Sequence, residues 1–209
     1  MVHGLHWAVV VAVGQLVLVS CGEPHSIAID CTPASPEELR NKQPEKLLWS
    51  SRDYQIQSQL MKLEITANKS KGYVRGVPDL AIRAYGGWLF GFDHGEWGGV
   101  LVYQSASGDI EILAEDNFYD IYSVPFGYVA FTSLNHLTLN EGKVYRVTQV
   151  RDRFRVEQSH VLPGAPRSVY LLKGGGILVQ VDASKFGDRL ESKTLLVGED
   201  GSLRSITCN

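Results

Sequence analysis

Residues 88–104 read Trp-Leu-Phe-Gly-Phe-Asp-His-Gly-Glu-Trp-Gly-Gly-Val-Leu-Val-Tyr-Gln, and they decide the fold class of this chain. The first and last runs, 88–92 and 100–104, are rich in apolar, aromatic and β-branched residues, and each has the length of a strand. Glycines and charged residues stand between them, which is typical of a turn. The stretch therefore predicts two antiparallel strands joined by a wide turn.

The same pattern extends along the chain from residue 54 to its end. Short β-branched and aromatic runs alternate with segments of Gly, Asp, Asn and Pro, which is typical of all-β proteins. Further strand-sized runs lie at 110–113, 128–132, 144–150, 168–172, 177–181 and 203–207. We therefore predict an all-β fold.

One short N-terminal helix is expected beside the strands. Ser35-Pro36-Glu37-Glu38 has the pattern of a capping box with proline at the first helical position. The helix should end before Pro44, because proline cannot donate the backbone hydrogen bond that would continue it.

A weak internal repeat runs through the strands. Gly87, Gly127 and Gly176 each precede an apolar run, at steps of about 40 and about 49 residues, near the length of a propeller blade. A polar turn that contains glycine is expected downstream in each unit, at 107–109, 141–143 and 200–202. A closed propeller needs more units, and residues 45–84 are the candidate for a degenerate fourth. We predict propeller-like repeated antiparallel sheets, and a β-sandwich fits the same strands.

The N-terminus carries a second kind of signal. An apolar run at 8–19 is too short to span a bilayer and has the length of the core of a secretory signal. Its end, Leu18-Val19-Ser20-Cys21, resembles the lipobox of bacterial lipoproteins. The resemblance implies a signal peptide at 1–20 and lipidation of Cys21, with palmitate among the acyl chains. An ordinary cleaved signal with an incidental cysteine is the alternative.

The resemblance also implies a location. Cys21 is followed by Gly22 and not by the Asp that retains lipoproteins at the inner membrane, so the lipid anchor is expected in the bacterial outer membrane, facing the periplasm. Residues 21–34 are expected to form a lipidated tether, and residues 35–209 a single all-β domain. The domain would contact the membrane through its lipid alone.

Lipidation of Cys21 leaves two of the three cysteines, Cys31 and Cys208, near opposite ends of the mature chain. The compartment that the resemblance implies allows disulfides to form. We therefore predict a Cys31–Cys208 disulfide, and two unpaired thiols are the alternative.

The composition and the absence of several motifs argue against some classes of function. The net charge of −3 gives no reason to expect nucleic-acid binding. The sequence has no Gly-x-x-x-x-Gly-Lys loop and no Gly-x-Ser-x-Gly elbow, and Gly174-Gly175-Gly176 precedes a strand, not a helix. We expect no cofactor, no metal site and no enzyme activity.

The candidate binding residues lie in the turn between the first two strands described above. They are Asp93, His94, Glu96 and Trp97. A tryptophan beside charged residues is a common anchor of protein interfaces, which favours a partner-binding loop. The alternatives are a metal site, an acid/base pair of Asp93 and Glu96, and a polar hairpin whose Trp97 packs on the sheet.

The architecture as a whole is similar to that of the small immunity lipoproteins that accompany bacterial antibacterial effectors. This resemblance covers no functional residue. It implies a lipid-anchored periplasmic protein that binds a protein partner, as an immunity or inhibitor protein against a secreted toxin or hydrolase. The alternatives are an envelope assembly or scaffold lipoprotein and a small hydrolase that uses Asp93 or Glu96.

Overall fold

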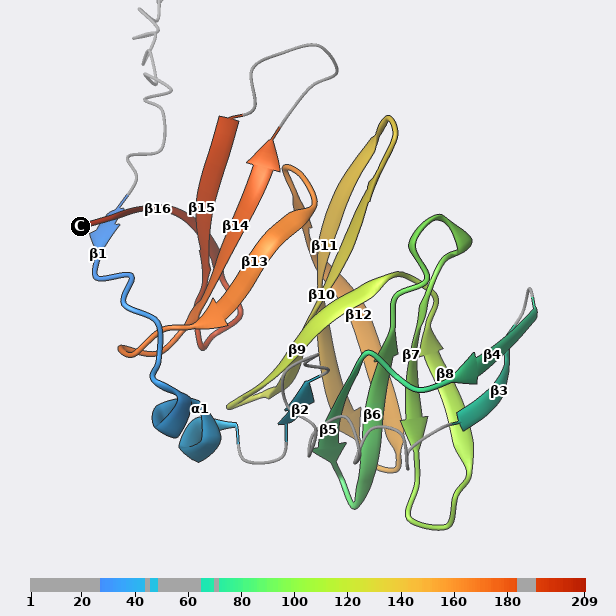
Figure 1. Ribbon diagram of the computed structural model, residues 1–209. Helices are drawn as coiled ribbons and strands as arrows, with labels where there is room; N and C mark the ends of the chain where they lie inside the picture. Colours follow the sequence, from blue (N-terminus) through green and yellow to red (C-terminus); the bar gives the residue numbers. More distant parts are fainter. Residues whose placement is uncertain (1–26, 44–45, 49–64, 70–71, 184–190) are drawn as a thin grey trace, which may run out of the picture.

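The computed structural model describes residues 27–43, 46–48, 65–69, 72–183 and 191–209. The described strands form three sheets and a two-stranded ribbon, accompanied by a short helix (Figure 1). The all-β prediction is confirmed. Cys21 and the predicted signal peptide lie outside the described residues. No helix within the described ranges is long and apolar enough to cross a membrane.

Each of the three sheets contains four antiparallel strands that follow one another in the sequence. The N-terminal sheet contains β5 (Leu80–Ala84), β6 (Gly87–Phe92), β7 (Val100–Gln104) and β8 (Ile110–Ala114). The middle sheet contains β9 (Phe118–Val124), β10 (Gly127–His136), β11 (Leu139–Val150) and β12 (Arg153–Leu162). The C-terminal sheet contains β13 (Pro166–Leu171), β14 (Ile177–Ala183), β15 (Glu191–Val197) and β16 (Leu203–Cys208).

Short strands extend two of these sheets. β2 (Lys46–Leu48) pairs with β5 in the N-terminal sheet, and β1 (Ile27–Ile29) pairs in parallel with β16 in the C-terminal sheet. β3 (Ile65–Lys69) and β4 (Gly72–Gly76) form the separate ribbon. Within the described ranges, residues 45–84 therefore supply single strands and a ribbon, and the expected fourth repeat unit is not formed there.

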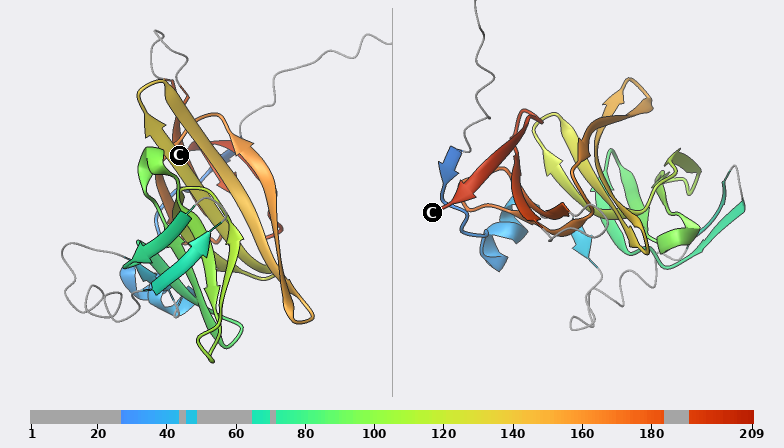
Figure 2. Two further views of the ribbon diagram at one scale, coloured as in Figure 1. Left: turned by 90° about the vertical axis from the view of Figure 1, so that its right-hand side faces the viewer. Right: turned by 90° about the horizontal axis from the view of Figure 1, so that it is seen from above.

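The middle sheet lies between the other two, and the three follow one another across the molecule (Figures 1 and 2). Val129 and Phe131 of β10 share a core with the C-terminal sheet, whereas Tyr128 and Ala130 share a core with the N-terminal sheet. Successive residues of a strand point to opposite faces, so four consecutive apolar residues are buried on both sides. These stacked meanders are the predicted repeated sheets, and face-to-face packing is also the arrangement of sandwich layers.

The predicted repeat corresponds to the sheets, with one error. Gly87 and Gly127 begin the second strands of their sheets, and Gly176 directly precedes β14. Residues 107–109 and 200–202 lie in turns, but 141–143 lie inside β11. A Cβ at Gly142 would come 2.5 Å from the Gly164 carbonyl oxygen. The glycine is therefore required by close packing of two backbone segments and does not mark a turn.

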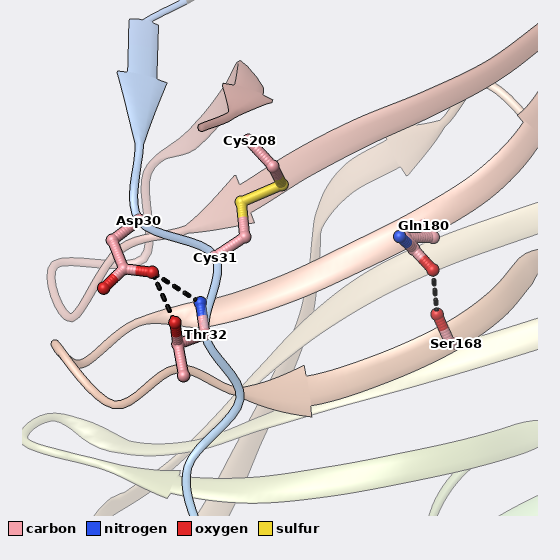
Figure 3. The surroundings of a disulfide bond; sticks show 6 residues. All are labelled: Asp30, Cys31, Thr32, Ser168, Gln180 and Cys208. Atoms are coloured by element: carbon pink, nitrogen blue, oxygen red, sulfur yellow. Dashed lines mark hydrogen bonds between the residues drawn. A yellow bond between two sulfur atoms is a disulfide. The ribbon is translucent and has the colours of Figure 1, made fainter.

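The predicted Cys31–Cys208 disulfide is present in the structure (Figure 3). It fastens the segment that follows β1 to β16, whose Cys208 is the register partner of Ile29. The backbone N–H and Oγ1 of Thr32 both donate to the Asp30 carboxylate, at 2.9 and 2.6 Å, and so close a turn around the disulfide. The two ends of the described chain are therefore joined at one sheet edge.

The structure corrects the predicted tether of residues 21–34. Residues 27–34 are part of the fold, since β1 pairs with β16, and Pro33 forms a bridge with Leu172. Ile29 and Cys31 pack against a buried cluster on the outer face of the C-terminal sheet, formed by Leu172, Leu178 and Ile206. A three-residue strand that pairs with the far end of the chain has no local sequence signal, which explains the error.

The predicted helix is α1 (Pro36–Lys42), and its capping box is formed. Ser35 N–H donates to the Glu38 carboxylate at 2.9 Å, and Glu38 N–H donates to Ser35 Oγ at 3.2 Å. Behind the helix, the buried Gln43 amide donates to the Ser123 carbonyl and accepts from the Ser123 N–H, at 2.8 and 2.7 Å. Gln43 thereby docks the helix end on β9 as a neighbouring strand would.

The helix cap is expected to weaken in acid. The hydrogen bonds from Ser35 hold the pKa of Glu38 below its ordinary value. A carboxylate with a depressed pKa in the folded state stabilises fully above its unfolded pKa, about 4.3, and the stabilisation is lost as the pH falls through the folded pKa. Glu38→Gln keeps a hydrogen-bond acceptor at this position but cannot titrate. The amide-exchange protection of the helix should therefore change less between pH 5 and about pH 3 in this variant than in the wild type. Glu37→Gln is the control, and equal profiles for Glu38→Gln and wild type would contradict the expectation.

Candidate functional site

The turn predicted from residues 88–104 is a loop between β6 and β7 that contains a single 3-10 turn, η1 (Gly95–Trp97). Hydrogen bonds to two carboxylates fix the backbone at the start of this loop. The Asp93 N–H donates to the Asp79 carboxylate at 2.8 Å, and the Asp93 carboxylate accepts from the Gly95 N–H at 2.9 Å. Asp93 is thus engaged in the backbone turn itself.

Opposite this loop lies the end of the β10–β11 ribbon. Leu134 is paired with Glu141, and His136 with Leu139, so these four residues share one face of the ribbon. Tyr145, on the same face of β11, packs against the core shared with the N-terminal sheet. The face therefore continues from that core toward the tip of the ribbon.

Two side-chain contacts hold η1 against the middle sheet. The Glu96 carboxylate lies 3.1 Å from His136 Nδ1 at the end of β10. Asn117, in the connection between β8 and β9, donates from Nδ2 to the Gly95 carbonyl at 2.8 Å. The loop is therefore fixed to two separate segments of the middle sheet region, at its backbone and at a side chain.

An open cleft of about 480 Å³ lies between η1, the 115–117 connection and the ribbon face. Its charged lining, among the described residues, consists of four carboxylates and one ammonium group: Glu96, Glu115, Asp116, Glu141 and Lys143. Trp97, Asn117, Leu134 and Tyr145 also line it. The cleft brings together residues from four separate strands or loops.

Asp116 is a carboxylate of the cleft that is hydrogen-bonded to other residues of the cleft lining. Its Oδ2 accepts from Lys143 Nζ at 2.8 Å and from the Tyr145 hydroxyl at 3.0 Å. Burial, and then the negative charge of Asp116, raise the pKa of Tyr145 above its ordinary value, so the hydroxyl remains a donor. Glu96, Glu115 and Glu141 are exposed, and they leave the rim of the cleft negative.

Two further residues of the cleft lining are unusual, one in its exposure and the other in its hydrogen bonding. Trp97 is 80% exposed, so the alternative in which it packs on the sheet is wrong. Asn117 is 3% exposed, and its Oδ1 has no hydrogen-bond partner in the part of the chain that the structure describes. A buried acceptor without a partner is uncommon in folded proteins and needs an explanation.

The four residues predicted for partner binding separate into two pairs. Glu96 and Trp97 line the cleft, whereas Asp93 and His94 are not among its lining residues. His94 precedes η1, and its ring lies 5.9 Å from that of Phe92. As for metal binding, the described residues contain no group of three or more His, Cys, Asp or Glu side chains placed to hold an ion.

Sequence reasoning missed Asp116, Asn117, Glu141 and Lys143 as members of the site. Residues 115–117 have an acidic, turn-forming composition, which is the only local signal they offer. Glu141 and Lys143 look like ordinary surface residues beside a glycine. These residues become neighbours only when the ribbon packs beside the β6–β7 loop.

Gly99→Ala is expected to destabilise the wall of the cleft. An added Cβ would clash with the Phe92 carbonyl oxygen and lie 2.6 Å from the Asp116 carbonyl oxygen, so two backbone segments would have to move. Overpacking of this kind costs about 1–3 kcal/mol of unfolding free energy, measurable by urea denaturation. Gly174→Ala, where an added Cβ meets no atom within 4 Å, is the matched control. Equal stability of the two variants would show that the backbone segments around Gly99 move apart without a cost in unfolding free energy.

The chemistry of the cleft fits a cation attached to an apolar group. Exposed carboxylates attract positive charge, and the indole of Trp97 offers a large apolar face that also attracts cations. The cleft is open to solvent, which suits a side chain that projects from another molecule. No protein-family model, curated protein or solved structure matches this chain.

Proposed function

We propose that this protein is a lipid-anchored periplasmic protein that binds another protein through the cleft beside η1. In its more specific form it is an immunity or inhibitor protein that neutralises a secreted antibacterial toxin or hydrolase. The lipid anchor and the outer-membrane location rest on the likeness of Leu18-Val19-Ser20-Cys21 to a lipobox. The protein-binding role rests above all on the 80% exposure of Trp97 at the cleft.

An exposed tryptophan on a fixed loop is a favourable anchor for a partner. Tryptophan is enriched among the interface residues whose truncation costs the most binding energy. Here the preceding residue, Glu96, contacts His136, and Asn117 holds the Gly95 carbonyl. Because the loop is already held in one conformation, little conformational entropy is lost on binding.

The Cys31–Cys208 disulfide supports the proposed location. Disulfides persist in oxidising compartments such as the bacterial periplasm and are rare in the cytosol. The bond joins strands at the two ends of the described chain, so oxidation has a direct structural consequence. A domain whose ends are joined in this way suits a compartment outside the cytosol.

The proposal is tested by crosslinking tagged protein in intact cells and identifying the captured proteins by mass spectrometry. Trp97→Ala should reduce capture of the partner at least about tenfold, as expected for an interface anchor. Val161→Ala, at a residue of β12 that is 68% exposed, is the control and should capture as the wild type does. Absence of any specific partner would refute the protein-binding role, and equal capture by Trp97→Ala would exclude this cleft.

A deletion strain distinguishes the immunity role from envelope assembly. An immunity protein protects only when its toxin is present, so the deletion strain should grow normally alone and lose viability when exposed to the toxin. Envelope damage in the deletion strain without any toxin would instead favour the assembly or scaffold role.

A further inference from the structure

We infer that the cleft recognises an arginine side chain that the partner presents, an inference that rests on the proposed protein-binding function. It combines four features of one cleft: exposed carboxylates, an exposed indole, apolar surface from Leu134 and Tyr145, and the neighbouring buried acceptor of Asn117, which has no partner among the described residues. Each corresponds to a part of the arginine side chain.

The charge of the cleft selects a cation. Asp116 and Lys143 form an internal pair, at 2.8 Å, and the exposed Glu96 and Glu141 lie at the rim of the same cleft. Glu96 is also 3.1 Å from His136, with 44% of its own side chain exposed, so its carboxylate remains accessible from solvent. A positively charged group that enters here gains from several carboxylates at once, whereas an anion would be repelled.

The exposed indole favours a guanidinium over an ammonium group. A guanidinium is planar, weakly hydrated and able to stack on an aromatic face while its N–H groups bind carboxylates. The same chemistry occurs within this chain, where the Arg83 guanidinium lies 4.6 Å from the ring centroid of Trp88. Trp97 offers such a face at the cleft, with 80% of its surface exposed.

Asn117 lines the cleft and carries a buried acceptor. Its Nδ2 is engaged by the Gly95 carbonyl, which fixes the amide in place, and its Oδ1 has no partner among the described residues. Leaving a buried acceptor unpaired costs free energy, and a donor that reached this oxygen would recover the cost. A guanidinium carries five N–H donors and no acceptor, so it suits this wall.

The dimensions agree with this ligand. A volume of about 480 Å³ is in the range of ordinary ligand sites and has room for a whole arginine side chain. Leu134 and the Tyr145 ring give apolar surface for the methylene stem, which arginine buries while its charged end remains near polar groups.

The inference is tested by titrating the ¹⁵N-labelled protein with N-acetyl-arginine amide and recording NMR shifts. The expected shifts cluster at the Trp97 indole N–H, the Asn117 side-chain amide and the backbone of Gly98. N-acetyl-citrulline amide has the same shape without the charge and should bind several-fold more weakly. Equal binding of the two compounds, or shifts scattered over the surface, would overturn the inference.

Two variants that change the net charge of the cleft in opposite directions provide a second test. Glu141→Gln should weaken arginine binding about twofold to fivefold, as expected for an exposed ion pair. Lys143→Gln removes the ammonium group that opposes the ligand and should strengthen binding. Glu191→Gln, at an exposed residue of β15, is the control and should change nothing. Effects of the same sign for Glu141→Gln and Lys143→Gln would contradict electrostatic recognition, and unchanged amide spectra elsewhere establish that each variant is folded.

The two proposals fail in distinguishable ways. If a partner is captured through Trp97 but its arginine residues can all be replaced by glutamine without loss, the protein-binding function stands and the arginine inference falls. If arginine amide binds in the cleft while no partner is captured from cells, the cleft chemistry stands and the proposed function falls.

Discussion

Removal of the Cys31–Cys208 disulfide is expected to lower the free energy of unfolding by about 2–5 kcal/mol, the usual cost of removing a native disulfide from a small domain. The bond joins residues 177 positions apart, and closing so long a loop restricts the unfolded chain strongly. The loop-entropy relation sets an upper value of about 5 kcal/mol for this length.

The native state is also expected to loosen locally. The disulfide holds residues 27–34 over the cluster of Leu172, Leu178 and Ile206. β1 is only three residues long and Ile27 is 52% exposed, so strand pairing alone gives this segment little stability. Amide exchange should therefore increase in β1 and β16 before it increases in the middle sheet.

The measurement is urea unfolding of the wild type and of a Cys31→Ala, Cys208→Ala double variant, each with and without reductant. Reductant should shift the midpoint of the wild type to that of the variant and leave the variant unchanged. A variant as stable as the oxidised wild type would show that β1 and its neighbours are held by packing alone.

Strands with local signals could be predicted from the sequence. Residues 88–92 and 100–104 correspond to β6 and β7 almost residue for residue, because apolar runs end at glycine-rich turns on both sides. The longer β11 shows the limit. Its prediction began at 144, whereas the strand begins at Leu139. Glu141-Gly142-Lys143 has the composition of a turn, and only the close approach of the Gly164 backbone explains the glycine.

The site was half predictable for a similar reason. Glu96 and Trp97 stand out by residue type within a loop that the sequence locates well. Their surroundings come from β11 and from residues 115–117, and no local pattern shows that these segments meet. Stacking of the N-terminal and middle sheets brings them together, and stacking depends on contacts distant in sequence. Asp93 and His94 lie outside the cleft lining, where the Asp93 carboxylate accepts from the Gly95 N–H within the turn and the His94 ring lies near Phe92.

Phe131→Ala is expected to cost about 3–5 kcal/mol of unfolding free energy, the range for a buried aromatic residue in a core. Phe131 is fully buried in β10, in the cluster that joins the middle and C-terminal sheets. Its ring lies 6.3 Å from that of Tyr122, at 80° to it. Rigid strands on both sides limit collapse, so a cavity remains where the ring was.

The location of that cavity makes the substitution a test of the stacked arrangement as well as of stability. Because Phe131 contacts the C-terminal sheet, amide exchange should accelerate in β14 around Val179, which belongs to the same cluster, more than in β6 of the N-terminal sheet. Val150→Ala, at a residue that is 55% exposed at the end of β11, should change stability by less than about 0.5 kcal/mol. Urea unfolding measures the first effect and hydrogen exchange the second. If Phe131→Ala disturbed β6 and β14 equally, the two faces of the middle sheet would behave as one core, contrary to the separate clusters seen on each side.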